Sequence, residues 1–81
     1  MSIKTNYNFK GIEIENAIIS IIRIFGSSKE GWNSLVGIYN TTKDAENLIE
    51  EFNHKVEYNE NENVYETIYN SLTVKYGGIK I

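Results

Sequence analysis

The segment Gly26-Ser-Ser-Lys-Glu-Gly31 combines glycine, two hydroxyls and a lysine, the residue types that bind phosphate. Basic and aromatic side chains on either side of it would add a second cation and a stacking surface for a nucleotide base. The order of residues differs from GxxxxGK[ST], and a strand-like run follows where a phosphate loop has a helix. A plain loop between two strands is the simpler interpretation. The candidate ligand-binding residues for a small anionic nucleotide are Arg23, Ser27, Ser28, Lys29 and Trp32.

Acidic residues concentrate between Thr42 and Glu66, where eight acids stand against two lysines, a local charge of −6 in a chain of net charge −3. No DxDxDG-like loop organises these carboxylates, so we expect no metal site and no cofactor. The balance excludes a duplex-DNA binder of the usual basic kind. A solvated surface explains the acids, although such a surface can also imitate nucleic acid or bind a basic partner. The candidate partner-binding acids are Glu46, Glu50, Glu51 and Glu57.

The chain has one histidine, His54, and no cysteine. We therefore expect neither a histidine-based triad nor a paired-histidine metal site within one chain, and the absence of cysteine excludes a thiolate metal site. An ordinary strand-edge histidine explains His54. We therefore expect no catalytic residue and a protein that is not an enzyme.

Aromatic residues are numerous, with six tyrosines, three phenylalanines and one tryptophan in 81 residues. Tyr65 and Tyr69 lie beside an apolar stripe in the C-terminal part of the chain and are candidates for a partner-binding surface. A helix that packs its tyrosines on a sheet explains the same residues.

The N-terminal part is strand-like. Two alternating runs joined by Lys10-Gly11 predict a tight hairpin, and its second arm continues into Ala17–Phe25, which is apolar on both faces. A third alternating run covers Trp32–Tyr39. So short a chain can barely cover both faces of the long strand, so we expect at least a dimer at micromolar concentration.

One face of that long strand is assigned to the core and the other to an oligomer interface. Ile18, Ile22 and Ile24 share one face, which we expect to pack under the helices. The opposite face is the predicted oligomer interface and carries Ile19, Ile21 and Phe25.

The C-terminal half predicts two helices. Thr41 or Thr42 would cap the first, with Asp44 in its first turn and an apolar stripe of Ala45, Leu48, Ile49 and Phe52. A short strand over 54–58 follows, and Asn63 with Glu66 resembles a capping box for a helix that ends at Gly77. The fold class is α+β: one domain over residues 1–81, about four antiparallel strands and two helices on one face, in the order β-β-β-α-β-α.

The chain shows no segment of signal-peptide type and no run approaching the roughly 20 apolar residues of a membrane span. We expect a soluble, unexported protein that does not bind membranes.

Residues 4–19 (KTNYNFKGIEIENAII) and 62–72 (ENVYETIYNSL) resemble a family of small proteins encoded near the tail and baseplate genes of bacteriophages of Gram-positive bacteria. That family begins with a KTYNFxGIEIxNAY-like strand and ends in an ENxIxxAYxxLK-like helix. This chain differs by lacking the family's proline after Glu62-Asn63 and by ending in KYGGIKI.

The resemblance implies a viral protein of the host bacterial cytoplasm that enters the virion or an assembly complex through protein contacts. Its expected partners are itself and a phage or host protein. The alternative is an anti-defence protein that covers a host immune protein or sequesters a nucleotide signal. The residues do not separate these two hypotheses.

Overall fold

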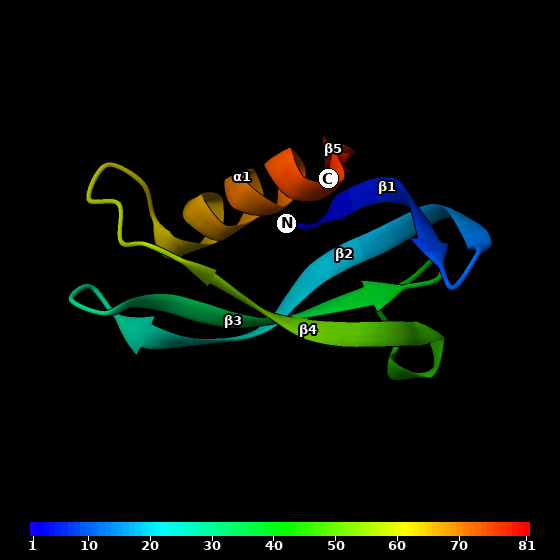
Figure 1. Cartoon of the computed structure of the whole chain (residues 1–81), viewed down its shortest axis with the longest axis horizontal. Coiled ribbons are helices and arrows are strands. Elements are labelled where there is room, and N and C mark those ends of the chain that lie inside the picture. The colour runs from blue at the N-terminus through cyan, green and yellow to red at the C-terminus, as the bar shows by residue number, and fades with distance from the viewer.

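The computed structural model describes residues 1–81 and places five antiparallel strands in one sheet, in the order β4-β3-β2-β1-β5, with one helix on one of its faces (Figure 1). The strands are β1 (Ile3–Phe9), β2 (Ile12–Ser27), β3 (Gly31–Tyr39), β4 (Leu48–Val56) and β5 (Ile79–Lys80). The helix is α1 (Val64–Tyr76), and a 3₁₀ turn, η1 (Ala45–Asn47), precedes β4. None of the helical segments has the length and hydropathy that crossing a membrane requires.

The β1–β2 hairpin confirms the predicted tight turn. Phe9 pairs with Ile12, and the two residues between them, Lys10 and Gly11, both have positive φ, of 52° and 86°. Positive φ at both central positions matches the right-handed twist of the flanking strands, and glycine accepts it without steric cost.

The helix α1 begins and ends as its sequence predicts. The Asn63 side chain accepts a hydrogen bond from the backbone N–H of Glu66 at 2.9 Å, and Gly77 follows the last turn with a φ of 76°. Ile68, Tyr69 and Leu72 form the buried stripe of the helix. Local capping and a continuous apolar stripe therefore both support this helix.

The core lies between α1 and one face of the sheet. Its fully buried members are apolar side chains from three strands and the helix: Ile3, Ala17, Ile19, Val36, Ile38, Ile68 and Leu72. Ile21 and Ile24 pack against this cluster from β2. The predicted assignment of faces is therefore wrong for Ile18, Ile19 and Ile21, because Ile19 and Ile21 lie under the helix, whereas Ile18 lies on the other face.

A β-bulge in β2 explains why Ile24 and Phe25 nevertheless lie on their predicted faces, Ile24 under the helix and Phe25 away from it. Ile21 pairs with Val36 and Arg23 with Leu35, so Ile22 is an extra residue without a cross-strand partner. Side chains beyond a bulge change faces relative to strict alternation. Ile24 therefore joins the core, and Phe25, which alternation placed with Ile19 and Ile21, lies on the opposite face.

The predicted first helix is also wrong. Residues 48–56 form β4, which pairs along β3 from Trp32–Val56 to Tyr39–Leu48. The expected capping side chains bind one another, because the Thr42 hydroxyl donates to Asp44 and accepts from the Asn47 amide. The sheet thus gains a longer fourth strand where the sequence predicted a helix and a short strand. Ile79–Lys80 adds a fifth by pairing with Ile3 and Lys4 of β1.

Candidate interaction surfaces

The face of the sheet opposite α1 carries an uncovered apolar surface. The side chains of cross-strand partners point to the same face of a sheet. The pairings of β2 with β3 and of β3 with β4 therefore show which side chains of the three strands lie side by side on this face. Phe25 is 48% exposed and Ile22 is 42% exposed, and Leu35, the β3 partner of Arg23, is half-buried beside them. We call the surface formed by Ile22, Phe25 and Leu35 the open face.

The open face has a flat floor and a charged rim. A Cβ at Gly37 would approach the Ile22 side chain to 2.9 Å, so Ile22 lies across β3 at this glycine. Arg23 lies on the β2 side of Leu35 and Asn53 on its β4 side. Exposed residues of β4 on the same face complete the rim: Glu51 and Lys55.

The other end of this face is closed. Ile18 and Tyr39, which pair with each other, are both buried. Ile18 lies in a hollow of about 390 Å³ that is also lined by Thr41, Thr42 and Lys43 of the β3–β4 connection. Burial, followed by the charge of Glu51, raises the pKa of the Tyr39 phenol. On β2, the exposed apolar side chains of this face therefore lie toward the end that carries Phe25.

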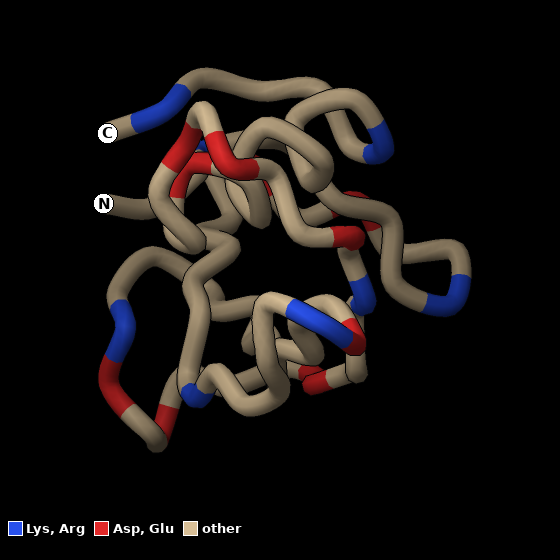
Figure 2. Tube along the Cα trace, turned by 90° about the vertical axis from the view of Figure 1, so that its left-hand side faces the viewer, with Lys and Arg blue, Asp and Glu red and all other residues tan.

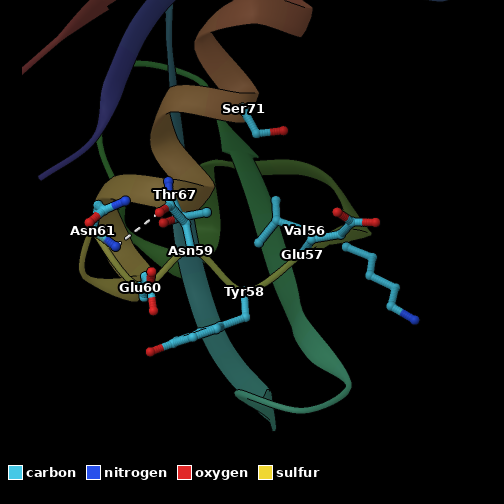
Figure 3. Close-up of a pocket in the computed structure, with 9 residues that line it drawn as sticks. Val56, Glu57, Tyr58, Asn59, Glu60, Asn61, Thr67 and Ser71 are labelled. Atoms are coloured by element: carbon cyan, nitrogen blue, oxygen red, sulfur yellow. Dashed lines mark hydrogen bonds between the residues drawn. The ribbon is translucent and has the colours of Figure 1, made fainter.

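A second feature is an open polar groove between the end of β4 and α1 (Figure 3). It has a volume of about 720 Å³, and Thr67 and Ser71 project into it from α1. The groove is also lined by Lys55, Val56, Glu57, Tyr58, Asn59, Glu60 and Asn61. Asn59 is held in place, because its amide donates to Glu62 at 2.8 Å and its side-chain oxygen accepts from the N–H of Asn61.

The arrangement nearest to catalytic chemistry lies at the edge of this groove. The Nε2 atom of His54 is 2.8 Å from the Ser71 hydroxyl. Burial, followed by the charge of Lys75, lowers the pKa of His54, so its imidazole is neutral at pH 7. A neutral histidine can accept a serine proton, but hydrolytic triads also place a carboxylate on the other ring nitrogen. The hydrogen bonds of His54 include no such carboxylate; its bond to Ser71 connects β4 to α1.

This connection predicts a pH dependence of stability. The pKa of His54 is lower in the folded protein than in the unfolded chain, so protonation favours unfolding. The stabilisation is complete above the unfolded pKa of about 6.5 and is lost as the pH falls below it. Urea unfolding from pH 7.5 to 5 should therefore show a steeper loss of stability for the native protein than for His54→Gln. Parallel pH profiles would contradict this role of His54.

The predicted nucleotide-binding residues are not brought together. Arg23 pairs with Leu35 on the open face, whereas Trp32 packs against the core on the α1 side of the sheet. The Ser27 hydroxyl accepts a hydrogen bond from the N–H of Glu30 within the turn. Ser28 and Lys29 line a separate hollow of about 360 Å³ together with Glu57. A carboxylate in that hollow opposes the binding of phosphate.

The predicted acidic surface is also divided, because the helix that was to display it is absent. Glu46 lies in η1, and Glu51 lies on the rim of the open face. Glu50 points to the other face and accepts a hydrogen bond from Tyr7. Burial and this bond raise the pKa of Tyr7 to about 12. Glu57 lies in the groove, at the end of the molecule where Figure 2 shows acidic and basic positions interspersed.

The two candidate tyrosines differ. Tyr65 is exposed on α1 and is available to a partner. Tyr69 is 2% exposed, and its hydroxyl accepts a hydrogen bond from the N–H of Ile21 at 3.0 Å. Tyr69 is therefore part of the interior and is not accessible to a partner.

Sequence reasoning missed Leu35 and Ile22 as surface residues. Alternation placed Ile22 on the same face as Ile18, which agrees with the structure, but that face was assigned to the core and is the one opposite α1. Gly37 was the one available signal, since a glycine within a strand allows the close approach of a neighbour.

Comparison with protein-family models, curated proteins and solved structures finds no match to this chain. Nowhere in the structure do three or more His, Asp or Glu side chains gather as they would around a metal ion.

Proposed function

We propose that this chain is a non-enzymatic interaction protein that binds another protein through its open face. The observation that carries the proposal is the exposure of Ile22 and Phe25 beside Leu35. Single exposed apolar residues are ordinary on protein surfaces, but adjacent ones framed by polar residues are typical of interfaces. Arg23 and Glu51 supply such a frame.

The biological setting follows from the resemblance of residues 4–19 and 62–72 to phage proteins encoded near tail genes. We propose a virion-associated or assembly accessory protein that is made in the host bacterial cytoplasm. Inhibition of a host immune protein through the same open face is the alternative. Sequestration of a nucleotide signal is less well supported, because Arg23 and Trp32 lie on opposite faces of the sheet.

The non-enzymatic part of the proposal rests on the role of the one histidine. His54 bonds to Ser71 between two packed elements, and this bond explains both residues without a reaction. A substrate whose turnover disappears on Ser71→Ala, in protein that remains folded, would overturn this part of the proposal.

The proposed function predicts where the protein goes during infection. Mass spectrometry of purified virions of a phage that carries the gene should detect the native protein. It should detect much less of Ile22→Ser/Phe25→Ser at equal expression, because the substitutions remove apolar contacts from the open face. The matched control is Val74→Ser, which changes an apolar residue that is 89% exposed on α1.

Absence of the native protein from virions would contradict the virion role. The anti-defence alternative would then require that the protein protect the phage against a host defence and that Ile22→Ser/Phe25→Ser abolish this protection. Equal behaviour of this variant and the native protein in both assays would overturn a role for the open face.

A further inference from the structure

We propose that the outer edge of β4 pairs with the same edge of a second copy of this chain, so that two sheets join into one across a twofold axis beside Asn53. The axis is perpendicular to the sheet, so both α1 helices lie on one side of the joined sheet and both open faces on the other. This inference goes beyond the proposed function and does not depend on it.

The strand β4 has the longer uncovered edge of the sheet. It stands at one end of the strand order, whereas β1, near the other end, is covered by β5 at Ile3 and Lys4. A bulge at Ile49 interrupts the start of β4. Bulges hinder the pairing of sheet edges, so the segment that a second strand can reach is residues 50–56.

Two contacts show which backbone groups of β4 point toward β3. The carbonyl oxygen of His54 accepts a hydrogen bond from the Ser34 hydroxyl at 3.0 Å. A Cβ at Gly31 would approach the carbonyl oxygen of Val56 to 2.7 Å. Both oxygens therefore point into the sheet, and the even-numbered residues of β4 bond to β3.

The odd-numbered residues of β4 must then direct their backbone groups outward, because successive residues of a strand alternate in direction. These residues are Glu51, Asn53 and Lys55. None of the backbone hydrogen bonds that lie outside the helix and the sheet involves them. Three N–H and three C=O groups in a row are thus free to bind another strand, as in strand addition at a sheet edge.

The side chains of this edge are complementary to their own copy. An axis beside Asn53 places Glu51 of one copy directly opposite Lys55 of the other, and the symmetry repeats this pair. Both side chains are exposed, and opposite charges directly across two strands stabilise the pairing. On the α1 side of the sheet, Phe52 lies opposite His54 of the second copy.

The hydrogen-bonding pattern and the charges together select this register. Outward groups must meet outward groups, so only odd-numbered residues can pair with odd-numbered residues. An axis beside Glu51 would place this carboxylate opposite itself, and an axis beside His54 would place it opposite Glu57. An axis beside Phe52 would pair Lys55 with Ile49, which lies in the bulge.

The expected affinity is modest. Stable interfaces bury about 800 Å² on each partner, and one pair of short strands offers less than this. We therefore expect a dimer that forms at micromolar concentration and weakens with added salt, since its paired charges are exposed.

A charge exchange tests the register. Dissociation constants of the purified full chain would be measured by sedimentation equilibrium. Glu51→Lys and Lys55→Glu should each raise the dimer dissociation constant about tenfold, because each replaces two attractions by two repulsions. The double variant Glu51→Lys/Lys55→Glu should restore it to within about threefold of the native value. Lys10→Glu, at the far hairpin turn, makes the same change in net charge as Lys55→Glu and should leave the constant unchanged.

A proline at Asn53 tests the backbone pairing itself. Asn53→Pro removes an outward N–H and leaves the bonds between β3 and β4 intact, so the variant should fold but stay monomeric. In the native protein, amide hydrogen exchange at Asn53 and Lys55 should slow as the protein concentration rises through the dissociation constant. Circular dichroism would establish that each variant is folded.

Recovery in the double variant, together with concentration-dependent protection of these amides, supports the proposed dimer. A dimer that is insensitive to both single charge variants, or whose Asn53 and Lys55 amides exchange equally fast at all concentrations, overturns the pairing of β4. A native protein that is monomeric at all concentrations up to the millimolar range also overturns it. Neither result affects the proposed role of the open face, which virion incorporation of Ile22→Ser/Phe25→Ser tests separately.

Discussion

Replacement of Leu72 by alanine is expected to lower the free energy of unfolding by about 2–5 kcal/mol. Leu72 is fully buried and belongs to the cluster that joins α1 to the sheet, together with Ile38 and Ile3. Truncation leaves a cavity that these side chains can fill only in part. A domain of this length has a total stability of about 4–12 kcal/mol, so the variant would lose a large fraction of it.

Urea unfolding followed by circular dichroism would measure this loss. The matched control is Val74→Ala, two positions along the same helix, where the side chain is almost fully exposed. Its effect should stay within about 0.5 kcal/mol, as is usual for surface substitutions. If the two variants lost the same stability, α1 would not pack on the sheet through the face described above.

The helix that carries Leu72 was predictable from the sequence because its signals are local. Asn63 caps it, Glu66 follows at the expected spacing, and Gly77 ends it. The hairpin at Lys10-Gly11 was predictable for the same reason, since two adjacent residues determine its turn. Local signals of this kind, such as helix caps and turn residues, can be recognised in the sequence without knowledge of the fold.

Residues 48–56 were not predictable in this way. Leu48, Ile49 and Phe52 fit a helical stripe, whereas Phe52, His54 and Val56 fit the alternation of a strand. The choice between them depends on β3, which needs a second neighbour for its backbone groups and obtains one from β4. Such long-range pairing outweighs a local pattern, and the pattern alone does not reveal it.

The candidate sites depended on these same elements. The acidic residues Glu46, Glu50 and Glu51 separated because their helix became a turn and a strand. The predicted oligomer face is divided, because Ile19 and Ile21 lie in the core and the bulge at Ile22 leaves Phe25 on the opposite side of the sheet. The chemical type of each residue can be read from the sequence, but its position depends on a register that only the folded sheet defines.

The role of Tyr69 also depends on how the strands pair. The sequence offered it as a partner contact beside Tyr65, and the two lie four residues apart on α1. The strand β1 reaches β2 only as far as the pair Ile3–Ile19, so the N–H of Ile21 lies beyond its end. The Tyr69 hydroxyl takes the place of the missing strand and accepts that bond, and it also lies 3.5 Å from the Ser20 hydroxyl.

Tyr69→Phe is therefore expected to destabilise the protein by about 1–3 kcal/mol, because it leaves a backbone donor without a partner in the interior. Amide hydrogen exchange should also become faster at Ile21, since the bond that protects this N–H is gone. Tyr65→Phe removes the same hydroxyl from an exposed position and should change neither quantity. Unchanged stability and exchange in Tyr69→Phe would show that the hydroxyl does not complete the sheet. The role of Tyr69 would then have to be sought in its contact with a partner.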